Sequence, residues 1–132
     1  MLTAEVVEWL QGRMPRRDIF VKPGPREEQL PDYLVTVTRL PSATFTLDGI
    51  GELLPYRVVC RPAAFDSDSG EEFAADVDRA LLQHEIPLII GTTRVISIDS
   101  QGRPYPQDID AGERIPWVCT YLFDTIPLEG GS

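Results

Sequence analysis

The stretch RIPWVCTYLFD, residues 114–124, decides the fold of this 132-residue chain. Every second position in it carries an apolar side chain, and alternation of this length predicts a strand with one buried face. The side chains expected on that face are Ile115, Trp117, Cys119, Tyr121 and Phe123. A long strand with an apolar face needs other strands to pair with and a layer to cover it, so the rest of the chain is expected to supply both.

Outside this strand, β-branched and alternating segments predict further strands, of which YLVTVTRL at 33–40 is the clearest. The other strands are expected at residues 18–22, 53–61, 88–90 and 94–99. Apolar residues at helical spacing predict helices over about 4–14 and 70–84. Thr3 is the expected N-cap of the first helix, and Ser69 with Glu72 forms the expected capping box of the second.

This element order predicts a single α+β domain spanning residues 1–132. We expect a mostly antiparallel twisted β-sheet with two α-helices packed on one face, plus an extended β-hairpin or loop. The hairpin would pair residues 44–47 through a turn at Asp48-Gly49. The same connection holds apolar side chains where loops are usually polar, so it is interpreted equally as a folded-back hairpin or as a partner surface. These side chains are Phe45, Leu47, Ile50, Leu53 and Leu54.

The charge balance narrows the classes of partner. The chain has 21 acidic and 12 basic residues and a net charge of -9. A general nucleic-acid binder needs a basic surface to displace counterions, and an anionic membrane surface also attracts basic proteins, so neither partner is expected. The apolar run at 86–90 is far too short to span a bilayer. The charge fits simple solubility, or a surface that nucleic acid passes without binding.

The residues that usually carry catalysis or bind metals are sparse and badly spaced. His84 is the only histidine, and it falls at the expected end of the second helix, where a structural role fits best. Cys60 and Cys119 lie in predicted strands and are expected to be buried free thiols, or a disulfide if those strands are neighbours. We therefore expect no catalytic residues, no cofactor, no metal site and no enzymatic activity.

In its order of segments, the chain resembles the tail terminator proteins of long-tailed bacteriophages. The resemblance covers nearly the whole chain: an amphipathic first helix (TAEVVEWLQGRM), a strand with a Pro-rich link (IFVKPGPREEQLPD) and a β-branched strand (YLVTVTRL). A strand then leads into a helix (YRVVCRPAAFDSDSGEEFAADVDRALL), and two strands around a Gly-Pro loop precede an aromatic strand that follows an arginine (RIPWVCTYLF). Each motif alone is weak, and their order carries the resemblance.

The resemblance implies a structural protein of the virion. Such a protein forms a homo-oligomeric, usually hexameric ring that caps the tail tube, stops its polymerisation and offers a docking face to the head-tail connector. It would be made in the host cytoplasm and reside in the tail or neck, and genomic DNA would pass through its lumen without specific binding. A head-tail connector or head completion protein is the alternative, followed by a small α+β ligand-binding protein or enzyme.

Three sets of residues are candidates for these contacts. The apolar connection described above is the candidate subunit interface. The candidate docking residues lie in two long polar segments: Arg26, Glu27, Arg103, Tyr105 and Asp108. The candidate lumen acids are Asp66, Asp68 and Glu71, and they do not match a calcium loop, because Val77 occupies the position of its bidentate glutamate.

Overall fold

The structure is a computed structural model, and it describes residues 1–24, 32–41, 44–45, 51–85, 88–109 and 113–127. Within these ranges the chain forms two α-helices, one short 3-10 helix and eight strands. In chain order they are α1 (Thr3–Gln11), β1 (Ile19–Pro23), β2 (Tyr33–Arg39), β3 (Thr44–Phe45), β4 (Glu52–Arg61), η1 (Ala64–Ser69), α2 (Gly70–Leu82), β5 (Leu88–Ile90), β6 (Thr93–Ser100), β7 (Tyr105–Pro106) and β8 (Trp117–Pro127).

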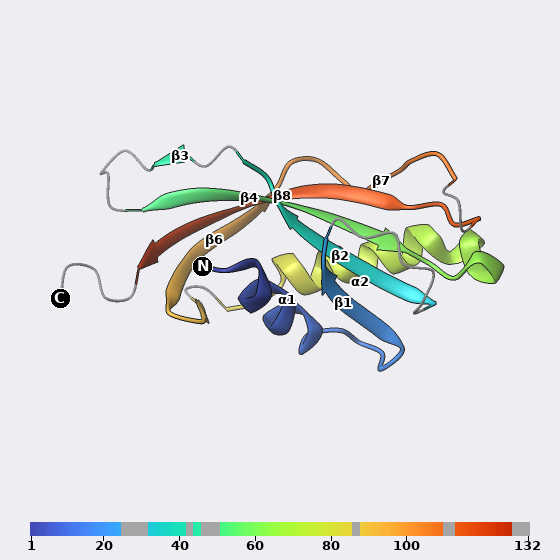
Figure 1. The fold of residues 1–132 in the computed structure, drawn as a ribbon, viewed down its shortest axis with the longest axis horizontal. Helices are drawn as coiled ribbons and strands as arrows, with labels where there is room; N and C mark the ends of the chain where they lie inside the picture. The colour runs from blue at the N-terminus through green and yellow to red at the C-terminus, as the bar shows by residue number, and fades with distance from the viewer. Residues whose placement is uncertain (25–31, 42–43, 46–50, 86–87, 110–112, 128–132) are drawn as a thin grey trace.

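The arrangement confirms the predicted α+β class with a mostly antiparallel, curled sheet. The strand order is β1-β2-β4-β8-β6-β5, with β3 beside β4 and β7 beside β8. Among the described strands, β1 and β2 are the one pair that is parallel. Figure 1 shows α1 and α2 on the same side of the sheet, as the sequence predicts. The short β3, paired with the start of β4, is the described part of the expected hairpin.

The strand predicted from residues 114–124 becomes β8, the centre of the sheet. It lies between β4 and β6, and the register sets Tyr121 opposite Tyr56. Cys119, Tyr121 and Phe123 are buried beneath the helices, which confirms the alternation for these three residues, whereas Trp117 is half-buried and Ile115 precedes the strand. One difference is Val118, which is also buried although it lies on the opposite face. Its burial follows from the register, because Val118 lies between Val59 on β4 and Tyr105 on β7.

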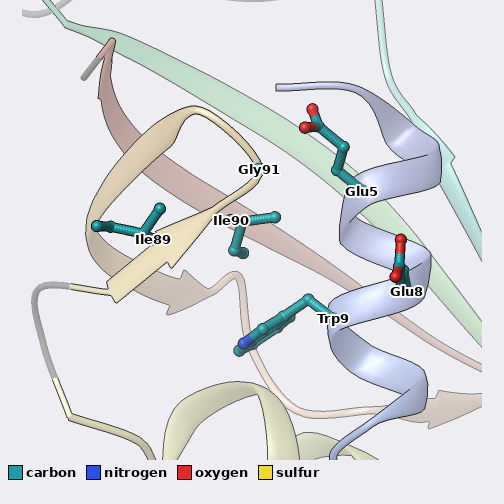
Figure 2. Close-up of a pocket in the computed structure, with 6 residues that line it drawn as sticks. All are labelled: Glu5, Glu8, Trp9, Ile89, Ile90 and Gly91. Atoms are coloured by element: carbon teal, nitrogen blue, oxygen red, sulfur yellow. The ribbon is translucent and has the colours of Figure 1, made fainter. Parts of the chain in front are cut away.

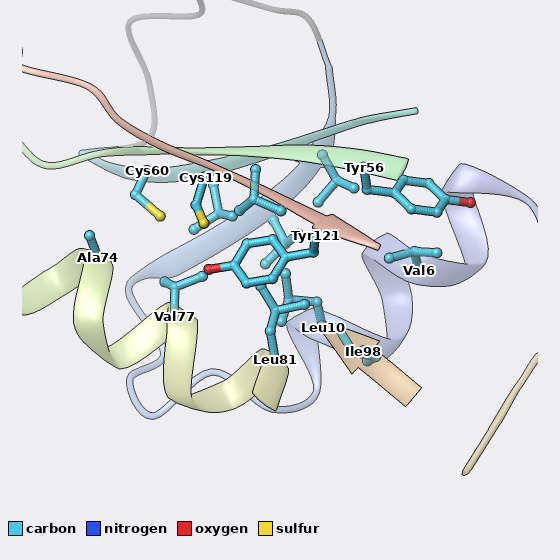
Figure 3. Packing of buried hydrophobic residues seen from close by; sticks show 14 of the residues in the cluster. Val6, Leu10, Tyr56, Cys60, Ala74, Val77, Leu81, Ile98, Cys119 and Tyr121 are labelled. Atoms are coloured by element: carbon cyan, nitrogen blue, oxygen red, sulfur yellow. The ribbon is translucent and has the colours of Figure 1, made fainter. Parts of the chain in front are cut away.

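The core lies between the helices and the inner face of the sheet (Figure 3). Helix α1 contributes Val6 and Leu10, which are one turn apart on one face. Helix α2 contributes a longer stripe, and the buried side chains along it are Phe73, Ala74, Val77 and Leu81. Burying a large apolar side chain stabilises a protein by roughly 1.5–3 kcal/mol, so this contact between helices and sheet is the main source of stability.

The predicted N-cap of α1 is wrong, whereas Ser69 takes its predicted position before α2 but does not make the predicted capping bond. Helix α1 begins at Thr3 itself, after an extended Leu2 whose N–H donates to Glu5 Oε1 at 2.8 Å. Ser69 precedes α2 as predicted, but its hydroxyl donates to the carbonyl of Asp66 at 2.9 Å. The preceding η1 turn explains this, because it presents that carbonyl to the hydroxyl before the helix begins.

Two arginines join parts of the fold that are distant in sequence. Arg13 follows α1, and its guanidinium donates to the carbonyls of Ala80 and Gln83 at 2.8 and 2.7 Å. These carbonyls belong to the C-terminal turn of α2 and lack helical partners, so a cation there is favourable. Arg114, which is buried, donates to the carbonyl of Asp32 at 3.2 Å and connects the segment before β8 to the start of β2.

Candidate subunit interface

The sheet ends in two strands of different character, β1 and β5, with α1 packed against both. On β1, Ile19 and Val21 are buried, whereas Phe20 between them is 45 % exposed on the outer face. On β5, Ile90 is buried and Ile89 is 57 % exposed. Large exposed apolar side chains on both outermost strands of one sheet are candidate contact points.

The free edge of β1 is occupied by a side chain of the same molecule. The Gln11 amide donates to the carbonyl of Ile19 at 2.8 Å and accepts from the N–H of Val21 at 2.7 Å. These backbone groups would otherwise be available to a strand from another chain. A partner at this edge therefore meets the Phe20 side chain rather than this stretch of β1 backbone.

A hollow of about 340 Å³ lies between α1 and β5 (Figure 2). Its apolar walls are Trp9 from the helix and Ile89 and Ile90 from the strand, and Glu5 and Glu8 give it an acidic rim; Gly91 completes the lining. The indole of Trp9 is held by an edge contact to the His84 ring, with centroids 5.6 Å apart. The hollow thus combines a fixed apolar wall with two carboxylates.

The backbone conformation of the β5–β6 turn favours glycine at position 91, which lies beside the Glu5 carboxylate of α1. Ile90 pairs with Thr93, so Gly91 is the first residue of a two-residue turn, and its φ is +60°, in the left-handed region. A Cβ there would lie 1.6 Å from Oε2 of Glu5. The absent side chain leaves room for the Glu5 carboxylate beside the turn, where both residues line the hollow.

The predicted apolar patch is only partly described. Leu54 is 2 % exposed and belongs to the core, which removes it from any surface patch. The reason is register: it lies opposite Phe123 and shares its inward face. Leu53, on the outer face, is half-buried, and Phe45 belongs to β3, although its side chain is not described. Leu47 and Ile50 lie outside the described residues.

The predicted docking residues fall into two groups. Arg103, Tyr105 and Asp108 are exposed, and Tyr105 lies in β7, a strand that the sequence did not predict. Strand β7 pairs with β8 beyond the end of β6, which makes this segment part of the sheet rather than a free loop. Arg26 and Glu27 lie outside the described residues.

The predicted lumen acids lie around η1 and the start of α2. Asp66 accepts a hydrogen bond from the Tyr33 hydroxyl, and this bond is the main reason that the pKa of the carboxyl lies below its ordinary value. Asp68 and Glu71 are exposed. Of the three acids, Asp66 is thus bonded to Tyr33 of β2, and Asp68 and Glu71 lie on the surface.

Cys60, Cys119 and Tyr121 form a buried group of polar side chains under α2. Cys60 and Cys119 lie on neighbouring strands as free thiols, and the register offsets them, with Cys119 opposite Val58. Burial, followed by the proximity of Cys119, raises the pKa of the Cys60 thiol far above its usual range. The Tyr121 hydroxyl donates to Asp78 on α2 at 2.6 Å, and its pKa is raised by burial first and by this bond second.

The remaining candidate groups are His84, metal-binding clusters and membrane-spanning helices. His84 lies two residues beyond the end of α2, with Nδ1 3.4 Å from the carbonyl oxygen of Glu85. Among the described residues, no cluster of three or more His, Cys, Asp or Glu side chains could hold a metal ion. Neither described helix is long and apolar enough to cross a membrane.

Sequence reasoning missed the exposed apolar residues at both sheet edges, although a signal was present. The segment IFV has three consecutive apolar residues, and so does LII at 88–90. Because strand side chains alternate between faces, such a run must place one apolar side chain on the face opposite to its neighbours. In an edge strand with one covered face, that residue is Phe20 or Ile89.

The chain was also compared with known proteins. No protein-family model matches it, and no curated protein matches it.

Proposed function

We propose that this protein is a structural subunit of a phage tail, which forms a ring that caps the tail tube, stops its polymerisation and offers a docking face to the head-tail connector. The order of segments that resembles tail terminators supports this proposal, and the described elements follow that order. The observation that carries it is the pair of unlike apolar sites, Phe20 on β1 and Ile89 on β5.

A subunit with two different contact sites can join head to tail, and a ring forms when the rotation between neighbours closes. Identical self-complementary patches would instead give a two-fold dimer. The segment around β7 and the exposed acids beside α2 would then face the tube, the connector or the lumen. The net charge of -9 suits a lumen wall that repels phosphate.

The proposal is tested by adding the purified protein to tail tube protein during polymerisation. Electron microscopy should show shorter tubes that carry a ring at one end, and light scattering should give the number of subunits in that ring. Tubes of unchanged length without bound protein would overturn the proposed function. Rings that bind the connector and leave tubes unchanged would favour the alternative, a head completion protein.

A ligand-binding role is the second candidate, because the hollow between α1 and β5 has apolar walls and an acidic rim. Its volume of about 340 Å³ is at the lower end of the range for small-molecule sites, roughly 300–1,000 Å³. A protein that stays monomeric and binds a small amphiphilic cation through Glu8 and Trp9 would support this role.

A further inference from the structure

We infer that the ring closes by a side-chain contact in which Phe20 of one copy enters the α1–β5 hollow of the next copy. This inference rests on the proposed function for its ring, and it names the two surfaces that meet. We call Phe20 with its basic neighbours Arg17 and Lys22 the β1 knob. We keep the name α1–β5 hollow for the cavity with the Glu5 and Glu8 rim.

Size and shape favour this pairing. Phe20 extends from the outer face of β1 and is 45 % exposed, so its ring is available without unfolding. The hollow has a volume of about 340 Å³, and a cavity of about 150 Å³ already accommodates benzene. In Figure 2 the Ile90 side chain points from β5 towards α1 and Trp9, whereas Ile89, which also lines the space, projects to the other side of the strand. An inserted ring would therefore contact Trp9 and Ile90.

Charge favours the same pairing. Arg16 and Asp18 form an ion pair at 3.4 Å and offset each other, so among the described residues from 13 to 24 Arg17 and Lys22 are the cations nearest in sequence to Phe20 that this pair leaves. Lys22 shares the outer face with Phe20, because the two are two residues apart on β1. The rim of the hollow carries Glu5 and Glu8. Two cations thus meet two carboxylates around an apolar centre, in a chain whose net charge would otherwise oppose self-association.

The surroundings of the hollow define the direction of approach. Arg94, a cation, lies opposite Ile89 in the register, but on β6, the next strand inward from the edge. The carboxylates are on α1, across the hollow from β5. A basic knob is therefore attracted to the helix side of the hollow. Because Gln11 occupies the backbone edge of β1, the contact uses side chains and not an added strand.

The first test is assembly of single variants, measured by light scattering over a range of concentrations. Phe20→Asp and Ile89→Asp should each raise the concentration needed for assembly at least about thirtyfold, as loss of a buried aromatic anchor does. Ile96→Asp is the matched control, because Ile96 is also exposed, at 37 %, but does not line the hollow. Equal effects of all three variants would overturn the inference.

The decisive test mixes the two variants. Phe20→Asp subunits keep an intact hollow, and Ile89→Asp subunits keep an intact knob. A head-to-tail contact therefore predicts that the mixture forms 1:1 heterodimers and stops there, whereas each variant alone stays monomeric. A mixture that remains monomeric, although the wild-type protein assembles, would overturn the inference.

Reversing the charges gives a second test of the same contact. Glu8→Lys and Arg17→Glu should each weaken assembly, and a chain carrying both substitutions should recover it.

A wild-type protein that is monomeric in solution is tested by cross-linking. Arg17→Cys and Glu8→Cys variants are mixed and treated with a short thiol cross-linker, since Cys60 and Cys119 are buried. Cross-linked dimers that form only in the mixture support the contact, and their absence at high concentration overturns it.

Capping of tail tubes is measured separately, so that failure of the contact and failure of the proposed function can be told apart. Knob-dependent rings without capping would reject the proposed function alone, whereas capping unaffected by Phe20→Asp would reject the contact alone.

Discussion

The two helices cover the same face of one sheet, yet they cover it to different extents. Helix α2, with 13 residues, buries a continuous stripe against β4, β6 and β8. Helix α1, with 9 residues, buries Val6 and Leu10, and beside it lies the α1–β5 hollow. Both sequences are amphipathic, so the difference comes from length and position: a short helix at the curled edge cannot cover the last strand. We expect the α2 side to provide most of the stability of the fold and the α1 side to provide contacts with other copies of the chain.

The largest effect should come from removing an aromatic ring from the closed part of the core. Phe123 is fully buried, and its ring contacts that of Tyr56 at a centroid distance of 5.1 Å. Phe123→Ala should lower the free energy of unfolding by about 3–5 kcal/mol, because it removes apolar contacts and leaves a cavity. Denaturant unfolding measures this. Ile89→Ala, at the exposed edge, is the control and should change stability by no more than about 0.5 kcal/mol. Similar losses in both variants would contradict the proposed division between the two sides.

The next effect tests how α1 is held against the β5–β6 hairpin. Gly91→Ala should cost about 1–3 kcal/mol, because alanine is strained at a φ of +60° and its Cβ would displace the Glu5 carboxylate. Gly102→Ala is the matched control: its φ is +98°, but nothing lies within 4 Å of the new Cβ. In a Glu5→Ala background the cost at Gly91 should fall toward the cost of strain alone, as a thermal-unfolding cycle can show. Full additivity would contradict the close contact.

A smaller effect should come from the bonds that join the two sides. Arg13→Met keeps the aliphatic stem of the side chain but removes two hydrogen bonds to the end of α2. We expect a loss of about 1–2 kcal/mol in the free energy of unfolding, measured by denaturant titration. Arg17→Met should leave the stability of the monomer unchanged, because Arg17 is exposed in the turn before β1. An equal loss at Arg17 would point to general charge rather than to the two bonds.

The smallest effect depends on pH and concerns the bond between Tyr33 and Asp66. This bond lowers the pKa of the Asp66 carboxyl relative to the unfolded chain. A lowered pKa stabilises the fold above the unfolded value, about 3.9, and this contribution is lost as the pH falls through the folded value. The stability difference between wild type and Tyr33→Phe should therefore be present at neutral pH and shrink below about pH 4. A difference that grows on acidification would contradict this assignment.

Most of the architecture could be predicted, because the elements leave local patterns. Alternation identified β2 and β8, and helical spacing identified α1 and α2 to within a few residues at each end. The caps could not be predicted, since they depend on which polar atom is nearest: Glu5 reaches the N–H of Leu2, and Ser69 turns back to Asp66. Of the candidate interface residues, Leu54 was misplaced: alternation along β4 puts it on the same face as Tyr56 and Val58, and the sheet order and helices show that this face is the buried one.

The sequence by itself determined the fold class and the central strand, because periodicity is a local property. Its composition also shows that groups which could carry out catalysis are few. Only the tertiary structure decided that Phe20 and Ile89 are the exposed apolar side chains at the two edges of the sheet, and that Trp9, Glu5 and Glu8 meet β5 around a hollow. The physical reason is that exposure depends on what covers a residue. Sheet order, curl and helix length set that cover, and residues far apart in the chain supply it.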